Sequence, residues 1–262
     1  MAIKKRETKK LARYELDEIE NFVFDSTNIT NKRLSDIKFN KTFKTQKQKD
    51  LYKKILNNRI IFVKGTAGTG KTFIALMAAL ECLINTDYNI NKIALTKPIV
   101  EVSKSLGALP GDEKEKTLQY FVHFYDNLSK LLKNKSDMKI LKENNYIIET
   151  ILNYIRGNTF GEYDNNGNPI GSVCILDEAQ NTTVNEIKTF ISRMGENTKL
   201  IICGDPDQID IKLKLNEING FDHCWNILQN LENIDFIEFT EDDIVREKLL
   251  IDIMKRFKMH QI

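Results

Sequence analysis

The residues with the clearest chemical potential form a glycine-rich loop, Gly65-Thr66-Ala67-Gly68-Thr69-Gly70-Lys71-Thr72, between an apolar run and a helix-like run. The loop fills every fixed position of the pattern GxxxxGK(S/T). In this pattern the glycines let backbone N–H groups turn toward the phosphates of a nucleotide, and the helix that begins at Lys71 directs its positive dipole end at them. Lys71 neutralises the terminal phosphates, and the Thr72 hydroxyl is placed to bind Mg²⁺. We therefore predict a nucleoside triphosphate site, with a simple tight turn as the alternative.

Two adjacent carboxylates, Asp177 and Glu178, directly follow the apolar run 173–176. Ligands of open α/β sheets bind at the carboxyl ends of the strands. We expect Asp177 to hold Mg²⁺ from its outer shell and Glu178 to orient or deprotonate the attacking water. Acidic residues in this place also cap helices, so the pair would be a weak signal without the glycine-rich loop. Together with that loop, the pair indicates hydrolysis.

A further polar turn, Gly204-Asp205-Pro206-Asp207-Gln208, ends the next strand-like run. In a fold of this kind that edge lies beside the γ-phosphate, so we expect Gln208 to sense whether the phosphate is present. The alternative is an ordinary turn at the end of a strand, which Gly, Asp and Pro favour.

Strand-like and helix-like runs alternate along the chain and must position these residues. The strand-like runs are continuous, apolar and rich in β-branched residues, and they cover residues 59–64, 92–96, 172–176, 199–203 and 235–239. The helix-like runs cover residues 51–56, 73–84, 113–132, 184–194, 221–231 and 245–257. This alternation predicts an α/β fold, a mostly parallel sheet with helices on both faces.

The composition, 41% hydrophobic and 29% charged among 262 residues, is that of an ordinary soluble globular protein. The formal net charge of +2 does not mark a nucleic-acid-binding protein. The positive charge is uneven, however, because it crowds the chain up to Arg13 and again between Lys38 and Lys54. We expect a basic N-terminal extension over residues 1–44 and one α/β domain over residues 45–262. The extension is either a solvated tail or an arm that meets phosphate backbones.

Four cysteines stand far apart in the sequence, without any CxxC pair: Cys82, Cys174, Cys203 and Cys224. We expect buried, reduced thiols, with neither disulfides nor a zinc site. The sequence shows no signal peptide, and no apolar run approaches the roughly 18 residues of a membrane span. These features predict a cytoplasmic protein without a membrane partner.

Taken together, these motifs resemble the PhoH family of ATPases, the phosphate-starvation-inducible proteins. The resemblance covers about residues 45–257 in several ordered motifs. They are Lys97-Pro98-Ile99-Val100-Glu101, Leu106-Gly107-Ala108-Leu109-Pro110-Gly111-Asp112, Arg156-Gly157-Asn158-Thr159-Phe160, Asp177-Glu178-Ala179-Gln180-Asn181-Thr182-Thr183, Gly204-Asp205-Pro206-Asp207-Gln208-Ile209-Asp210 and Asp243-Ile244-Val245-Arg246.

The resemblance implies a RecA-like core, similar to the ATPase half of superfamily-one helicases. It implies ATP as the nucleotide, together with Mg²⁺, and assembly of the chain into a homo-oligomeric ring, a hexamer. By likeness to helicases, Gln48 is expected to read the adenine edge, a role that suits an amide with both donor and acceptor. Gln46 is the competing candidate, and a surface helix residue is the alternative for Gln48.

Arginines matter because hydrolysis builds charge on the transferred phosphate. Arg156, Arg193 and Arg246 lie in or near segments that match the family, and one of them is expected to act as an arginine finger, in cis or across a subunit interface. For Arg193, a salt bridge between two helices is an equal alternative. Arg246 ranks first because it follows the fifth strand and opens the last predicted helix.

Two features depart from the family pattern. Many family members carry an additional RNA-binding or nuclease-like domain, for which the region before Thr45 is too short and too charged. The usual Arg-Pro after the second strand is Lys97-Pro98 here, so the charge is kept but bidentate contacts are lost.

The combined features favour an ATP-driven enzyme that acts on nucleic acid, above all single-stranded RNA. A single RecA-like core cannot form the two-core cleft of a monomeric helicase, so this function requires an oligomer. Two further functions stay open: a P-loop phosphotransferase, and a nucleotide-dependent switch or assembly factor that binds a protein partner. The adjacent Asp177 and Glu178 suit water activation, which argues against the phosphotransferase. Nuclease activity has weak support, since the sequence shows no further cluster of carboxylates.

Overall fold

The structure, a computed structural model, describes residues 33–99, 113–213, 217–247, 249, 252, 253 and 256. Contacts along the chain define two units, residues 1–37 and 38–262. In the first unit the described residues form one 3₁₀ turn, η1 (Leu34–Asp36), in which the Arg33 N–H donates to the Asp36 carboxylate at 3.1 Å. The basic residues before Arg33 lie outside the described part of the chain, as do residues 100–112, which hold part of two family motifs.

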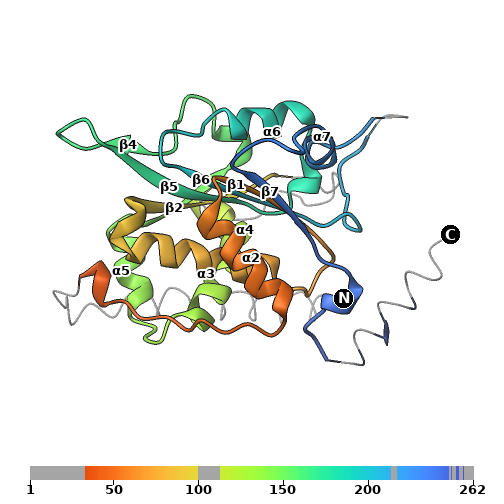
Figure 1. The fold of residues 1–262 in the computed structure, drawn as a ribbon, viewed down its shortest axis with the longest axis horizontal. Coiled ribbons are helices and arrows are strands. Elements are labelled where there is room, and N and C mark those ends of the chain that lie inside the picture. The colour runs from red at the N-terminus through yellow and green to blue at the C-terminus, as the bar shows by residue number, and fades with distance from the viewer. Residues whose placement is uncertain are drawn as a thin grey trace, which may run out of the picture. The chain divides into compact units, whose positions relative to one another are not determined.

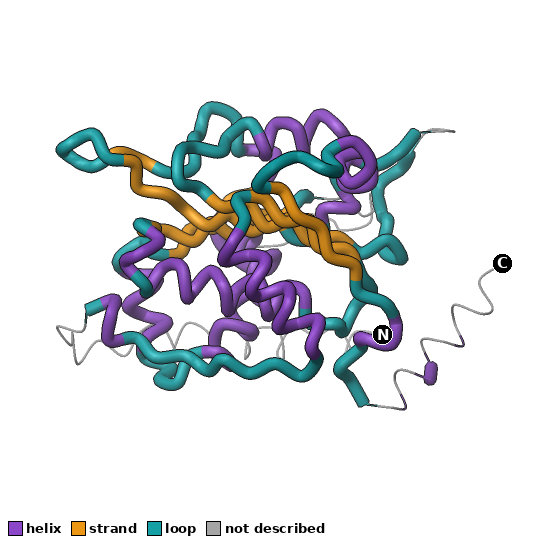
Figure 2. Tube along the Cα trace, viewed as in Figure 1, coloured by secondary structure: helices purple, strands orange, loops and turns teal. Residues whose placement is uncertain are grey.

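A seven-stranded sheet organises the described part of the second unit (Figures 1 and 2). Its strands are β1 (Ile60–Lys64), β2 (Ile90–Lys97), β3 (Ile147–Ile151), β4 (Glu162–Tyr163), β5 (Pro169–Leu176), β6 (Lys199–Gly204) and β7 (Ile234–Glu238). The strand order is β3-β2-β5-β6-β1-β7, and all neighbours in this order are parallel. The short β4 pairs antiparallel with β5 and lies off this path.

Helices cover both faces of the sheet (Figure 1). On one face lie α2 (Gln46–Asn57), α3 (Lys71–Ile84), α4 (Glu113–Leu131) and α5 (Asp137–Glu143), and on the other lie α6 (Val184–Ile191) and α7 (Gly220–Ile227). Short 3₁₀ turns complete the connections: η2 (Thr86–Tyr88), η3 (Leu152–Tyr154), η4 (Ala179–Asn181) and η5 (Glu241–Asp243). The expected α/β fold, a mostly parallel sheet with helices on both faces, is confirmed.

The core lies where α3 packs between the sheet and its neighbouring helices. Ala75, Ala78 and Ala79 are fully buried, and their small side chains allow the helix to approach the strands closely. On the other face of the sheet, Phe62 of β1 is fully buried in a cluster with residues of α6 and α7, and it stacks on Phe236 of β7 at a ring separation of 5.2 Å. Burying one such ring contributes about 1.5–3 kcal/mol. This packing fixes the carboxyl end of β1, and with it the start of the glycine-rich loop.

The structure corrects the expected elements at three places. α5, β3 and β4 were not predicted, and β3 escaped because Glu149 and Thr150 interrupt its apolar run and only its two end residues are buried in this edge strand. The helix expected over residues 221–231 begins at Gly220 and already ends at Ile227. The helix expected from Val245 begins later, because the Val245 N–H donates to the Gly68 carbonyl at 3.0 Å and holds the chain extended there. Leu249, Asp252, Ile253 and Arg256 are helical.

Candidate nucleotide-binding site

The glycine-rich loop joins β1 to α3, as expected. The Gly65 N–H donates to the Gly204 carbonyl at 3.1 Å, which ties the loop to the end of β6. Gly68 and Gly70 both have φ of 87°, in the left-handed region that favours glycine. A Cβ atom at Gly70 would lie 2.7 Å from the Gln48 amide nitrogen and one at Gly68 would lie 2.9 Å from Arg246 Nε, so a side chain at either place would displace these groups. Gln48 and Arg246, which are far away in the sequence, therefore lie directly against the loop.

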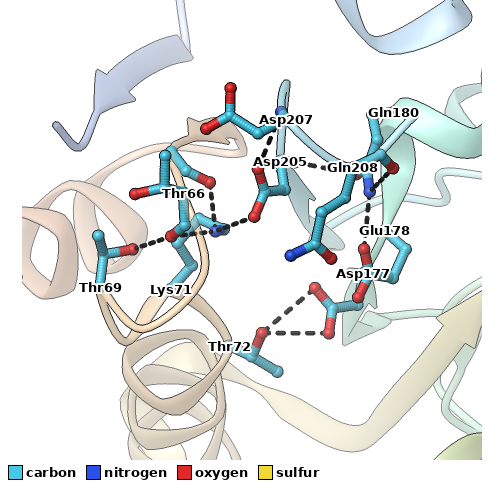
Figure 3. Close-up of polar contacts among 11 residues, drawn as sticks. Thr66, Thr69, Lys71, Thr72, Asp177, Glu178, Gln180, Asp205, Asp207 and Gln208 are labelled. Atoms are coloured by element: carbon cyan, nitrogen blue, oxygen red, sulfur yellow. Dashed lines mark hydrogen bonds and ion pairs between the residues drawn. The ribbon is translucent and has the colours of Figure 1, made fainter. Parts of the chain in front are cut away.

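Lys71 curls back over the loop that precedes it. Its ammonium group donates to the Thr66 carbonyl at 3.0 Å and to the Gly65 carbonyl, and it lies 4.0 Å from the Asp205 carboxylate (Figure 3). Thr69 closes the loop from within, because its hydroxyl donates to the Thr66 carbonyl at 2.9 Å. The buried positive charge of Lys71 thus lies at the centre of the loop, where it can meet the terminal phosphates of a nucleotide.

Thr72 and Asp177 meet across the site (Figure 3). The Thr72 hydroxyl lies 3.2 and 3.1 Å from the two Asp177 carboxylate oxygens, and His123 Nε2 lies 3.0 Å from one of them. Burial raises the pKa of Asp177, but the His123 hydrogen bond and the charges of His123, Lys97 and Lys71 outweigh it, so the pKa falls below its usual value. Asp177 is therefore ionised at neutral pH. A hydroxyl beside a carboxylate fits Mg²⁺, which prefers oxygen ligands.

Glu178 directly follows Asp177 in a left-handed conformation, with φ of 57°. A non-glycine residue in this region costs roughly 1–2 kcal/mol, so surrounding contacts must hold it. Gln180 supplies one of these contacts, since its Nε2 donates to the Glu178 carboxylate at 2.7 Å. The same Nε2 donates to the Gln208 carbonyl at 2.9 Å, while Gln180 Oε1 accepts from the Asp205 N–H at 2.9 Å. This fully buried amide joins the end of β5 to the turn after β6.

That turn, residues 204–208, carries Asp205 and Gln208. Burial raises the pKa of Asp205, against the opposing charge of Lys71. The Gln208 side-chain amide points into the space between Lys71 and Asp177 (Figure 3). The turn therefore directs the Gln208 amide toward the same space that Lys71 and Asp177 face.

The structure places Gln48 and the competing candidate, Gln46, in different environments. Thr45 caps α2 and accepts from the Gln48 N–H at 3.1 Å, which places Gln48 one turn into the helix on its buried side. Gln48 Nε2 donates to the Thr69 carbonyl at 2.9 Å, and Gln48 Oε1 accepts from the Lys44 N–H at 2.8 Å. Gln46 is exposed and donates to Asp50 at 2.8 Å. Only Gln48 of the two contacts the glycine-rich loop.

The three candidate arginines lie in different places. Arg246 packs on Gly68, inside the same chain, but in a bend and not at the start of a helix as expected. Arg156 is exposed and does not line the site. Arg193 also lies outside it; its Nη2 donates to Ser192 at 3.4 Å, and no ion pair joins Arg193 to another described residue. Arg246 is therefore the candidate that the structure brings to the loop.

These residues converge on one cavity of about 570 Å³. The predicted residues that line it are Ala67, Gly68, Gly70, Lys71, Thr72, Asp177, Glu178, Gln208, Gln48 and Arg246. Gly65, Thr66 and Thr69 do not line the cavity, and they take part in the hydrogen bonds within the loop. α4 contributes a further wall through His123, Asn127 and Lys130, which share one helix face because of their spacing of four and three residues.

Comparison with known proteins decides the family. Residues 41–258 match the family model described as PhoH-like protein. The chain belongs to the PhoH family.

Several curated PhoH relatives are similar over most of this chain. A PhoH-like protein of Bacillus subtilis is 36% identical over 214 residues, which are 82% of this chain and 63% of that protein. Protein PhoH of Escherichia coli K12 is 34% identical over 198 residues, which are 75% of this chain and 52% of that protein. The chain thus spans between half and two thirds of the length of these relatives.

Solved structures with a similar arrangement include Pif1 helicases. Pif1 of Candida albicans has a TM-score of 0.40 and 16% identity over 83% of this chain and 44% of that one. A Bacteroides Pif1 bound to single-stranded DNA has a TM-score of 0.40 and 13% identity over 85% of this chain and 47% of that one. The PhoH membership and the glycine-rich loop together make this chain a nucleotide-binding P-loop protein.

Two residues of the PhoH site were assigned no role from the sequence. Gln180 stands inside a quoted family motif, but its contacts depend on the packing of β5 beside β6. His123 lies on a predicted helix without any local motif, and only the packing of α4 brings it to Asp177. A motif search could have found Gln180, whereas no signal in the sequence points to His123.

The four cysteines are free and buried, as predicted. Burial raises the pKa of the Cys82 thiol to about 12 and that of Cys224 to about 11, so both stay protonated at neutral pH. No cluster of metal-binding side chains of three or more was found among the described residues. None of the described helices combines the length and apolarity needed to cross a lipid bilayer.

Proposed function

We propose that this PhoH protein is an Mg²⁺-dependent ATPase. The observation that carries the proposal is the convergence of three kinds of group on one cavity: the Lys71 ammonium group, the Thr72–Asp177 pair and the Glu178 carboxylate. Phosphate binding alone needs only the first of these. A carboxylate directly beside a metal-binding pair is the additional element that water activation requires.

Binding begins with the glycine-rich loop. Its backbone N–H groups and the amino-terminal end of α3 receive the phosphates, and Lys71 exchanges its contacts with loop carbonyls for the phosphate oxygens. The Thr72 hydroxyl would hold Mg²⁺ directly and Asp177 would hold it from the outer shell, and the bound ion would supply positive charge against the phosphates. The low pKa of Asp177 keeps its carboxylate available for this role at neutral pH.

Hydrolysis requires a base that accepts a proton from water. We assign this role to Glu178, whose carboxylate is directed by the Gln180 amide. Gln180 also holds the backbone of Gln208, so the two residues that face the γ-phosphate share one support. A change in the position of Gln208 on phosphate binding would therefore be transmitted to Glu178.

Gln48 and Arg246 complete the proposed site. Each polar atom of the Gln48 amide makes one contact with the backbone, which leaves one N–H and one lone pair for the adenine edge. Arg246 lies on Gly68 in the same chain, and we propose that it stabilises charge on the transferred phosphate in cis.

We further propose that ATP turnover is coupled to single-stranded nucleic acid, RNA above all, in a ring-shaped oligomer. The support is the order of the PhoH motifs and the presence of one P-loop core, which requires a second subunit to complete a helicase-like cleft. A switch or assembly role with a protein partner is the alternative, and stimulation of turnover by RNA would separate the two.

Phosphate release by the purified chain tests the ATPase proposal. We expect turnover of ATP with Mg²⁺, loss of turnover in EDTA, and loss of binding or turnover in Lys71→Ala. Lys188→Ala, an exposed lysine on α6, is the matched control and should behave as the parent. ATP turnover that is equal in Lys71→Ala and the parent would refute the proposed site.

A further inference from the structure

Lysines concentrate on the segment that precedes and forms α2. Residues 38–54 contain seven lysines and a single acid, Asp50, in a chain whose lysines and arginines otherwise nearly balance its acids. This local excess takes no part in the ATP site described above, apart from Lys44 at the edge of its cavity. The nucleotide alone does not explain it.

The fold adds a lysine from a distant segment. Phe39 forms an isolated antiparallel bridge with Leu132, directly after α4. In this bridge the Lys133 N–H donates to the Lys38 carbonyl at 3.0 Å, so backbone contacts hold two lysines beside each other. Both side chains are exposed.

Some of these lysines have internal partners. Lys41 pairs with Glu81, while Lys47 lies 2.7 Å from Asp243 and Lys54 lies 2.6 Å from Asp235. Four exposed lysines have no acidic partner among the described residues, and they form two pairs that the segment 39–48 connects along the chain. We call the two pairs together the basic surface: Lys38 with Lys133, and Lys49 with Lys53.

No ion pair among the described residues neutralises a lysine of the basic surface. Asp50 on α2 accepts a hydrogen bond from Gln46, and Asp126 lies exposed on α4, nearly two turns before Lys133. Lys49 and Lys53 are four residues apart on one helix face, an arrangement that destabilises a helix by about 0.2–0.5 kcal/mol. The fold therefore keeps like charges close together although they repel each other, and a bound polyanion would remove this repulsion.

The basic surface continues to the mouth of the ATP cavity. Lys44, between Lys38 and Lys49 in sequence, lines that cavity, as does Lys130, one helix turn before Lys133. A polyanion on the surface would thus reach the edge of the nucleotide site without entering it, which gives a physical route for coupling to ATP turnover.

We propose that the basic surface binds the phosphate backbone of single-stranded nucleic acid. Lysine ammonium groups act as point charges on phosphates and read no base, which suits binding without sequence preference. The chain runs along segment 38–44 and then turns into α2 (Figure 1), so a flexible strand can pass from one lysine pair to the other. The assignment rests on the nucleic-acid coupling in the proposed function.

Salt-dependent binding of fluorescent 20-nucleotide oligo(U) and oligo(dT) tests the assignment on the full chain. Each phosphate contact on a single strand contributes about 0.7 to the slope of log affinity against log salt concentration. For Lys38→Glu/Lys133→Glu we expect the magnitude of that slope to fall by about 1.4, with a loss of affinity of roughly tenfold or more at low salt. Loss for both oligonucleotides indicates a backbone contact.

Matched variants control for folding and for general charge effects. Lys38→Arg/Lys133→Arg keeps the charge and should bind as the parent, and Lys188→Glu on the opposite face of the sheet should change affinity less than about twofold. ATP turnover without nucleic acid should stay at the parental level in every variant. Lys49→Glu/Lys53→Glu provides an independent double variant with the same expectation.

Each contrary outcome is distinct. An unchanged slope in both glutamate double variants, with a parent that binds, would refute the surface and leave the proposed function intact. A change in oligomeric mass with unchanged affinity would make the surface a subunit contact and overturn the assignment. A parent that hydrolyses ATP but binds neither oligonucleotide would refute both the surface and the nucleic-acid coupling.

Discussion

Gln180 Nε2 donates to the Glu178 carboxylate at 2.7 Å, and the donor belongs to a side chain that is fully buried. Because the same amide contacts the backbone of Asp205 and Gln208, it fixes the distance between the proposed water-activating group and the turn after β6. Its role is one of positioning, since it contacts other side chains and backbone and not the reacting atoms.

Replacing Gln180 should therefore affect turnover more than binding. In Gln180→Glu the donor to Glu178 becomes an oxygen, so we expect kcat to fall roughly 10- to 100-fold while KM for ATP changes little. Steady-state phosphate release measures both constants. Gln46→Glu replaces an exposed amide and serves as control. A rise in KM with an unchanged kcat would show that Gln180 supports nucleotide binding instead.

Gln48 should contribute to nucleotide choice and to loop stability. Gln48→Ala removes the contacts with Thr69 and Lys44, so we expect weaker ATP binding, by about 10-fold or more, and less discrimination between ATP and GTP. Competition binding with a fluorescent nucleotide measures both effects. Gln46→Ala should leave them unchanged, and equal losses in the two variants would contradict the assignment to Gln48.

The ion pair between Lys47 and Asp243 should make stability depend on pH. Burial raises the pKa of Asp243, but hydrogen bonds from Lys47 and Thr240 lower it by more than burial raises it. The pKa of Asp243 therefore lies below its usual 3.8. A depressed pKa in the folded state contributes stability that is present above the unfolded value and is lost as pH falls through the folded value.

We therefore expect Asp243→Asn to lower the free energy of unfolding by about 1 kcal/mol at pH 7. The difference from the parent should shrink as the pH falls below about 4. Urea unfolding at several pH values measures it, with Asp126→Asn, an exposed carboxylate on α4, as the control. A difference that stays constant down to pH 3 would show that charge is not the cause.

The parts of the site that lie within one short segment could be predicted from the sequence. The glycine-rich loop needs only local spacing, and Asp177 could be placed because carboxyl ends of parallel strands meet at one edge. Gln208 followed from the same reasoning at the next strand. These residues follow the carboxyl ends of strands, so a parallel sheet is enough to bring them to one edge. The alternation of strand-like and helix-like runs in the sequence already indicated such a sheet.

The rest depends on tertiary contacts that leave no local pattern. His123 reaches Asp177 only through the packing of α4 on α3, and the hydrogen bond from Val245 to Gly68 decides that Arg246 lies outside a helix. β3 was missed because Glu149 and Thr150 interrupt its apolar run, as in a surface segment. Lys133 lies beside Lys38 only because Phe39 forms a bridge with Leu132, and no local pattern indicates that bridge.

The central claim is that Glu178 turns a nucleotide-binding loop into a hydrolytic site. Parallel measurement of ATP affinity and phosphate release in Glu178→Gln tests it most directly. We expect ATP affinity within about twofold of the parent, because the carboxylate does not hold the nucleotide, and turnover reduced by about 10²–10⁴-fold. Turnover in Glu178→Gln equal to that of the parent would contradict the account.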